Sequence, residues 1–99
     1  MIAYKLLKVR KDGSIGPLFI NCRQRIPIGE WLRAEFHPRK GYQPRKGWHC
    51  TLKPVAPHLT TKGPKWYKVR AAYWNKYKRP ESQGGTWVLA QAMMVLEAV

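Results

Sequence analysis

Carboxylates are the scarcest functional groups of this chain. Its 99 residues include only 5 Asp and Glu against 19 Lys and Arg, which gives a formal net charge of +14. A two-metal nuclease needs a cluster of carboxylates to hold its ions, and the segment from 36 to 80 contains none. The sequence therefore argues against metal-dependent hydrolysis, and we expect no catalytic residue.

Cysteines and long apolar runs are also scarce. Cys22 and Cys50 allow one disulfide at most, and the N-terminal segment lacks the apolar stretch and small-residue cleavage site of a secretion signal. No run of 18 apolar residues is present, so no membrane-spanning segment is predicted. We expect free thiols, a location in a reducing cytoplasm and no membrane partner.

Side chains that could bind a metal occur without the spacing that a metal site needs. His37, His49, Cys50 and His58 contain the nitrogen and sulfur atoms that zinc prefers, but they form neither a C-x-x-C nor an H-x3-H pair. His49 and Cys50 are neighbours, and neighbouring residues of a strand point to opposite faces, which argues against a base and nucleophile pair. We expect no metal and no cofactor.

Aromatic residues, by contrast, are abundant. The chain has 5 Trp, 5 Tyr and 2 Phe, and 44% of its residues are hydrophobic. A disordered basic tail would be poor in such residues, so we expect a folded domain. The length predicts a single domain, residues 1–99. Within it we distinguish a β-hairpin and following strand (1–35), a basic region rich in proline and aromatics (36–80) and an apolar C-terminal element (81–99).

The apolar pattern predicts short strands separated by turns. Residues 2–10 and 18–20 flank Asp12-Gly13, a typical hairpin turn, and further strands are expected at 24–28, 30–35, 48–52 and 66–77. In the last of these, alternation places Val69 and Tyr73 inward. The composition of 86–99 suits either a helix, capped by Thr86, or a buried strand. The predicted fold class is α+β: a small single domain dominated by an antiparallel sheet of about five short strands, with the C-terminal helix left open.

The segment from 36 to 80 holds 12 of the 19 basic residues and 8 of the 12 aromatics. It repeats the pattern Pro-Arg-Lys-Gly-aromatic at 38–42 and 44–48, and each copy predicts a turn. Cations can contact phosphates, and exposed rings can stack on unpaired bases; alternatively, the rings form the core. The candidate nucleic-acid-binding residues are Arg39, Lys40, Arg45, Lys46, Lys53, Lys65, Lys68, Arg70, Lys76, Lys78, Arg79, Tyr42, Trp48, Trp66 and Trp74.

Five short strings span most of the chain: GPLFIN (16–21), IPIGEWL (26–32), GWHC (47–50), PVAPHL (54–59) and RPESQGGTW (79–87). Together they resemble a family of short uncharacterised proteins encoded by phages and prophages. The resemblance implies an origin in a phage or mobile element and action in the cytoplasm of a bacterial host. It implies no activity.

The function that these observations favour is non-catalytic binding of nucleic acid. RNA or single-stranded DNA is favoured over duplex, because the sequence contains no recognisable recognition helix, zinc finger or basic zipper. One alternative is a phage-encoded inhibitor that binds a host defence protein or a ribonucleoprotein complex. A third is a small nucleotide-modifying enzyme that uses His49 and Glu81.

Overall fold

The computed structural model describes residues 1–18, 24–34, 47–56, 59 and 62–99. These residues form six strands and one short 3-10 turn: β1 (Ile2–Val9), β2 (Ile15–Gly16), β3 (Trp31–Arg33), β4 (Trp48–Thr51), β5 (Lys65–Lys78), η1 (Glu81–Gln83) and β6 (Thr86–Ala98). The structure thus confirms strands within the expected ranges 2–10, 30–35, 48–52 and 66–77.

The predicted α+β class is wrong, because the described residues are nearly all β and contain no α-helix. The C-terminal segment forms the 13-residue strand β6 instead of a helix capped by Thr86. β6 pairs with β5 on one edge and with β3 and β4 on the other, so both of its edges are hydrogen-bonded. This tertiary pairing outweighs the helical preference of its Ala, Leu and Met residues.

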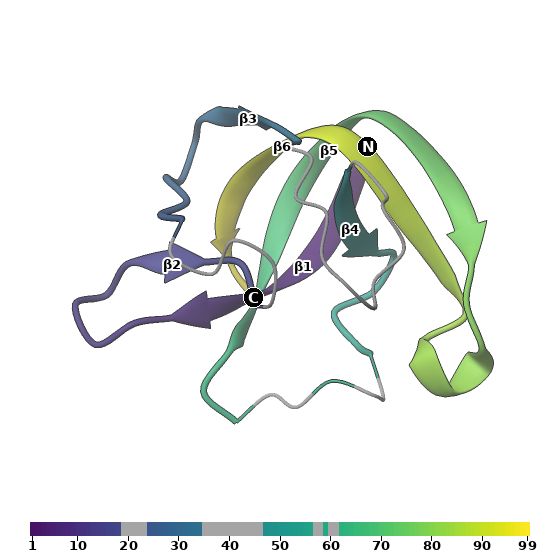
Figure 1. Ribbon diagram of the computed structural model, residues 1–99, viewed down its shortest axis with the longest axis horizontal. Helices are drawn as coiled ribbons and strands as arrows, with labels where there is room; N and C mark the ends of the chain where they lie inside the picture. The colour runs from purple at the N-terminus through teal and green to yellow at the C-terminus, as the bar shows by residue number, and fades with distance from the viewer. Residues whose placement is uncertain (19–23, 35–46, 57–58, 60–61) are drawn as a thin grey trace, which may run out of the picture.

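Four strands close into a small barrel. β1 pairs with β5, β5 with β6 and β6 with β4, all antiparallel. The ring is completed where Thr51 of β4 lies opposite Tyr4 of β1. β2 extends the sheet beside β1, and β3 extends it beside β6. Figure 1 shows β5 and β6 as two long curved strands that arch over the shorter ones.

The core lies inside this ring. Leu7, Val69, Val88, Met93 and Val95 are fully buried, and burial of each such side chain contributes about 1.5–3 kcal/mol to folding. Beyond Trp87 at the start of β6, the buried positions are the even-numbered Val88 and Ala90 and then the odd-numbered Met93 and Val95. Side chains of a regular strand alternate strictly, so an irregularity must lie between the two halves.

Tyr73 of β5 marks that irregularity. Its φ angle is 51°, in the left-handed region that non-glycine residues rarely occupy, and its side chain is 82% exposed. The prediction that Tyr73 points inward with Val69 is therefore wrong, although Val69 is buried as expected. A strictly alternating pattern cannot reveal a reversal of this kind within a strand.

The N-terminal hairpin forms at the expected turn but with a different second strand. Asp12 accepts hydrogen bonds from the backbone N–H and the hydroxyl of Ser14, and these bonds lower the pKa of its carboxyl to about 2. Gly13 has a φ of 86°, which glycine adopts without strain. The partner of β1 is β2 rather than the expected run at 18–20, of which the structure describes only Leu18. The strand expected at 24–28 is reduced to a single bridge between Ile28 and Val95.

Candidate nucleic-acid interface

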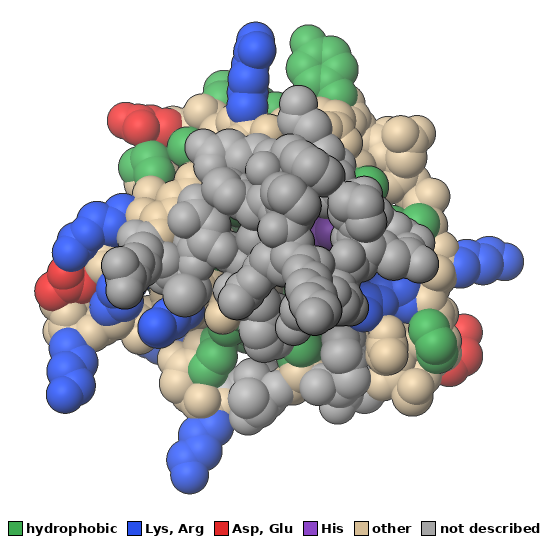
Figure 2. Space-filling view, viewed as in Figure 1, with side chains coloured by type: hydrophobic (Ala, Val, Ile, Leu, Met, Phe, Trp, Pro, Cys, Tyr) green, Lys and Arg blue, Asp and Glu red, His purple; other side chains and the backbone are tan. Residues whose placement is uncertain are grey.

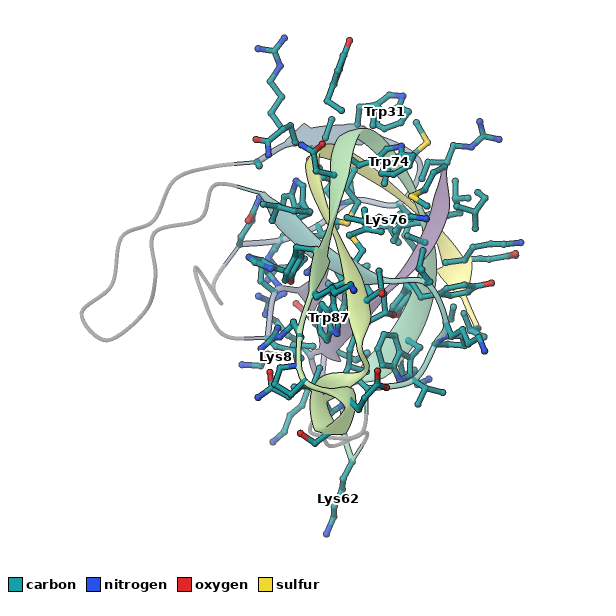
Figure 3. All side chains as sticks on the ribbon, turned by 90° about the vertical axis from the view of Figure 1, so that its right-hand side faces the viewer. Lys8, Trp31, Lys62, Trp74, Lys76 and Trp87 are labelled. Carbon is teal, nitrogen blue, oxygen red and sulfur yellow. The ribbon has the colours of Figure 1, made fainter. Side chains whose placement is uncertain are left out.

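Three aromatic side chains are exposed on and beside the β5–β6 hairpin. Trp31 of β3 is 51% exposed, Trp74 of β5 is 39% exposed, and Tyr73 is the most exposed of the three. Figure 3 labels Trp31, Trp74 and Lys76; Trp31 comes from β3, and Trp74 and Lys76 come from the second half of β5. Large rings in a small domain usually fill the core, so their exposure suggests a contact surface.

The strand register explains how Trp31 comes close to the cations of β5. Trp31 lies opposite Met94 of β6, and Met94 lies opposite Arg70 of β5. Residues directly opposite each other share a face of the sheet, so Trp31 and Arg70 are on one face with only Met94 between them. Trp74 lies opposite Ala90, four residues, or about 13 Å, from Met94 along β6. Ala90 is buried and lies beyond the reversal at Tyr73, so the register groups Trp31 with Arg70 but places Trp74 on the other face of the strand pair.

Alanines adjoin the Trp31–Met94–Arg70 row along the sheet. Ala92 of β6 lies opposite Arg33 of β3 on one edge and Ala72 of β5 on the other.

Three cations accompany these rings. Arg33, Arg70 and Lys76 are all exposed, and none of them forms an ion pair with a carboxylate in the part of the chain that the structure describes. Their charges are therefore free to meet an anion. We refer to Trp31, Arg33, Arg70, Tyr73, Trp74 and Lys76 together as the tryptophan surface.

The sequence identified Arg70, Trp74 and Lys76 but missed Trp31, Arg33 and Tyr73. Trp31 and Arg33 belong to the N-terminal third of the chain, and only the pairing of β3 with β6 brings them to β5. The one available signal was the pattern Trp-Leu-Arg at 31–33, in which alternation partly buries Leu32 and exposes its two neighbours.

Trp48 does not belong to an exposed surface. Its ring is 8% exposed, and its Nε1 donates a hydrogen bond to the carbonyl oxygen of Leu32 at 3.2 Å. The alternative that the sequence left open, a core role, applies to this ring. We therefore remove Trp48 from the candidate interface.

The other predicted site residues are dispersed. Lys53, Lys65 and Lys78 are exposed, and Trp66 is half-buried. Lys68 lies 3.8 Å from the carboxylate of Glu97, and the Arg79 guanidinium stacks on Trp87, 4.6 Å from the ring centre. Figure 2 shows Lys and Arg side chains around the whole rim of the view rather than gathered in one patch. Five candidates lie outside the described residues: Arg39, Lys40, Tyr42, Arg45 and Lys46.

His49 and Cys50 point to opposite faces of β4. His49 Nδ1 lies 2.6 Å from the hydroxyl of Tyr77, with the two rings in an edge-to-face arrangement. Cys50 is buried inside the barrel, and burial raises the pKa of its thiol. A thiol that resists ionisation and faces away from the imidazole is poorly suited to nucleophilic catalysis.

No metal cluster is found among the described residues. No three His, Cys, Asp or Glu side chains converge there. A shallow pocket of about 140 Å³ lined by Tyr4, Lys68 and the C-terminal residues 97–99 is present, whereas small-molecule sites usually measure about 300–1,000 Å³. In the described part of the chain, no helix has the length and apolar character needed to cross a membrane.

Comparison of the chain with protein-family models, with curated proteins and with solved structures gave no match.

Lys5 points into the barrel rather than toward a ligand. It lies between Ala3 and Leu7 on the inward side of β1, and its Nζ donates a hydrogen bond to the carbonyl oxygen of His49 at 2.7 Å. The Trp48 ring centre is 5.8 Å from the same atom. Burial lowers the pKa of Lys5, with the Cys50 thiol acting weakly in the opposite direction.

This burial predicts a stability that rises with pH. Between the lowered pKa of the folded state and the usual value near 10.5, the unfolded chain binds one more proton at Lys5 than the folded chain does, so raising the pH favours folding. Lys5→Met should flatten this rise, measured by urea unfolding between pH 7 and about 10. Lys8→Met, which changes an exposed lysine of the same strand, is the control. If stability rose equally steeply with pH in both variants, burial of Lys5 would not be the cause of the rise.

A substitution of Tyr73 should separate stability from binding. Asparagine tolerates a positive φ better than tyrosine does, so Tyr73→Asn should leave the free energy of unfolding unchanged or raise it by up to about 1 kcal/mol. The same variant should bind a single-stranded oligonucleotide more weakly, because it lacks an exposed ring. Thermal unfolding and fluorescence anisotropy measure the two effects, and a loss of stability of more than about 1 kcal/mol would show that the ring packs in the fold.

Proposed function

We propose that the protein binds single-stranded nucleic acid through the tryptophan surface. The observation that carries this proposal is the exposure of Trp31, Tyr73 and Trp74 beside cations that lack ion-pair partners among the described residues. Stacking of an unpaired base on an aromatic side chain is worth about 1–3 kcal/mol. Each released phosphate counterion adds to the affinity at low salt.

The shape of the surface supports a single strand over a duplex. The described residues contain no α-helix that could enter a major groove, and rings can stack only on bases that are not paired within a helix. A flexible single strand can bend from Trp31 toward Trp74, which lies about 13 Å away along β6 and beyond the reversal at Tyr73. The net charge of +14 favours association with any polyanion.

The origin in a phage and the action in a bacterial cytoplasm stay predictions from the sequence. Within that setting, a single strand of RNA or DNA is the ligand that the tryptophan surface favours. If no oligonucleotide bound in the following experiment, the remaining alternative would be binding to a protein of a host defence complex.

Salt titrations test whether the tryptophan surface contacts the phosphates. Affinities for oligouridylate and oligothymidylate of about 12 nucleotides would be measured by fluorescence anisotropy at several salt concentrations. In the Arg70→Gln/Lys76→Gln variant, the slope of log affinity against log salt should become shallower by about 1.4, or 0.7 for each lost contact.

Lys53→Gln/Lys65→Gln is the matched control, since it removes two exposed charges that lie outside the tryptophan surface. Its slope should equal that of the wild type. An equal change of slope in both variants would mean that the positive charge acts without a defined site, and absence of binding at low salt would refute the proposed function.

A further inference from the structure

Among the described residues, no strand covers one edge of the second half of β5. β1 covers the first half, from Leu7 opposite Lys65 to Ile2 opposite Arg70. Two hydrogen bonds between the main chains of Met1 and Ala71, at 2.8 and 3.1 Å, continue this ladder. Beyond Ala71, none of the described strands pairs with this edge of β5. Figure 3 is viewed from the side on which the edge lies, with Trp74 and Lys76 labelled.

The register shows which main-chain groups this edge presents. The N–H of Arg79 donates to the carbonyl oxygen of Gly85 at 2.7 Å, so Arg79 faces β6. Residues that face the partner alternate along an antiparallel strand, and the β5–β6 register is unbroken from Trp74 to Lys78. Asn75 and Tyr77 therefore bond to β6. Trp74, Lys76 and Lys78 turn their N–H and C=O groups outward.

The side chains at this edge define the chemistry of a partner. Trp74, Lys76 and Lys78 are exposed and alternate along one side of β5. Neither lysine forms an ion pair with a described carboxylate. An added strand would place its own side chains directly opposite these three. An apolar residue fits opposite Trp74, and acidic residues fit opposite the two lysines.

A second copy of this chain is a poor occupant. Two copies paired through this edge would bring their lysines together, and each copy has a net charge of +14. Lysines on an open edge strand are a common means of preventing such pairing between like chains. The same lysines attract a strand of opposite charge.

We propose that an extended acidic segment of a partner protein adds to β5 along this edge. Its main chain bonds to the outward N–H and C=O groups of Trp74 and Lys76, its carboxylates pair with Lys76 and Lys78, and an apolar side chain packs on Trp74. Addition of a strand to an exposed sheet edge is an established mode of peptide recognition. This interaction is separate from the proposed function, although Trp74 and Lys76 take part in both.

Two substitutions of Lys76 distinguish the contribution of its main-chain hydrogen bond from that of its side-chain charge. The probe is a fluorescein-labelled peptide with blocked ends, about nine residues long, whose centre reads Glu-Thr-Glu-Thr-Val. In an antiparallel strand this order places the two glutamates opposite Lys78 and Lys76 and the valine opposite Trp74. Lys76→Gln and Lys76→Pro both remove the charge, but only proline also removes the outward N–H, and an edge strand tolerates proline at such a position. We expect the proline variant to bind the peptide about tenfold more weakly than the glutamine variant.

Oligonucleotide affinity is the internal comparison, because phosphate contacts involve only the side chain of Lys76. It should be equal in the two variants. If no oligonucleotide binds but the two variants still differ in their affinity for the peptide, the proposed function fails and the inference about the edge stands.

Hydrogen exchange of the wild-type protein provides a second measurement that needs no substitution. Addition of the peptide should slow exchange at the amides of Trp74 and Lys76, which the register turns away from β6 and toward no described strand, while those of Asn75 and Tyr77 are bonded to β6 by the same register. Equal peptide affinity of the two Lys76 variants, or unchanged exchange at both amides, would overturn the inference. A stable dimer would overturn it too, if sedimentation velocity detected the dimer without peptide and its formation protected these amides. A second copy of the chain would then occupy the edge.

Discussion

Replacing Trp31 and Trp74 together with alanine should weaken the binding of a single-stranded oligonucleotide by about 30-fold or more. The estimate follows from two lost stacking contacts of at least about 1 kcal/mol each. Both rings are substantially exposed, so their removal should cost little folding energy. Anisotropy titration of the variant against oligouridylate measures the loss, and circular dichroism confirms that the β structure is retained.

The control for this experiment removes exposed apolar side chains elsewhere. Leu52 and Val55 follow β4 and are 37% and 60% exposed. Leu52→Ala/Val55→Ala should leave the affinity unchanged. If the double tryptophan variant also kept the wild-type affinity while folded, base stacking on the tryptophan surface would be excluded, and the cations alone would account for any binding.

Trp48→Ala should have the opposite profile, with a large loss of stability. The ring is buried in the barrel and bonded to the Leu32 carbonyl, and truncation of a buried tryptophan costs about 3–5 kcal/mol. The total stability of a small domain is about 5–15 kcal/mol. At about 4–8 °C for each kcal/mol in a domain of this size, the thermal midpoint should fall by about 12 °C or more.

Trp74→Ala is the matched control for Trp48→Ala, because it removes the same side chain from an exposed position. Its midpoint should change by only a few degrees, whereas its affinity for oligonucleotide should fall. Differential scanning fluorimetry and anisotropy on the same samples give both quantities. A Trp48→Ala variant with an unchanged midpoint and lost affinity would place Trp48 at the interface and contradict its core position.

These two tryptophans also show where sequence analysis succeeded and where it failed. Trp48 and Trp74 both stand beside basic residues in the segment from 36 to 80, and no local pattern distinguishes them. Trp48 is buried because β4 pairs with β6 and faces the inside of the ring. Trp74 is exposed because β1 does not extend along the second half of β5. The difference arises from which strands are neighbours, and strand neighbours are far apart in the chain.

The C-terminal segment gives the same lesson for secondary structure. Its Ala, Leu and Met residues favour a helix in isolation, and the analysis left helix and strand open. In the protein, β6 has partners on both edges, and the hydrogen bonds and side-chain packing from those partners exceed a propensity of a few tenths of a kcal/mol per residue. No window of the sequence contains that information.

The sequence by itself determined the features that depend on composition and on residues adjacent in the chain. The excess of cations, the scarcity of carboxylates, the turn at Asp12-Gly13 and the strands around 2–10, 48–52 and 66–77 all follow from residue types and short spacings. Closure of the ring, the reversal at Tyr73 and the meeting of Trp31 with Arg70 across β6 were decided by the tertiary structure. They depend on pairing between strands separated by dozens of residues, and the free energy of such pairing comes from packing and hydrogen bonds that exist only once the whole sheet has formed.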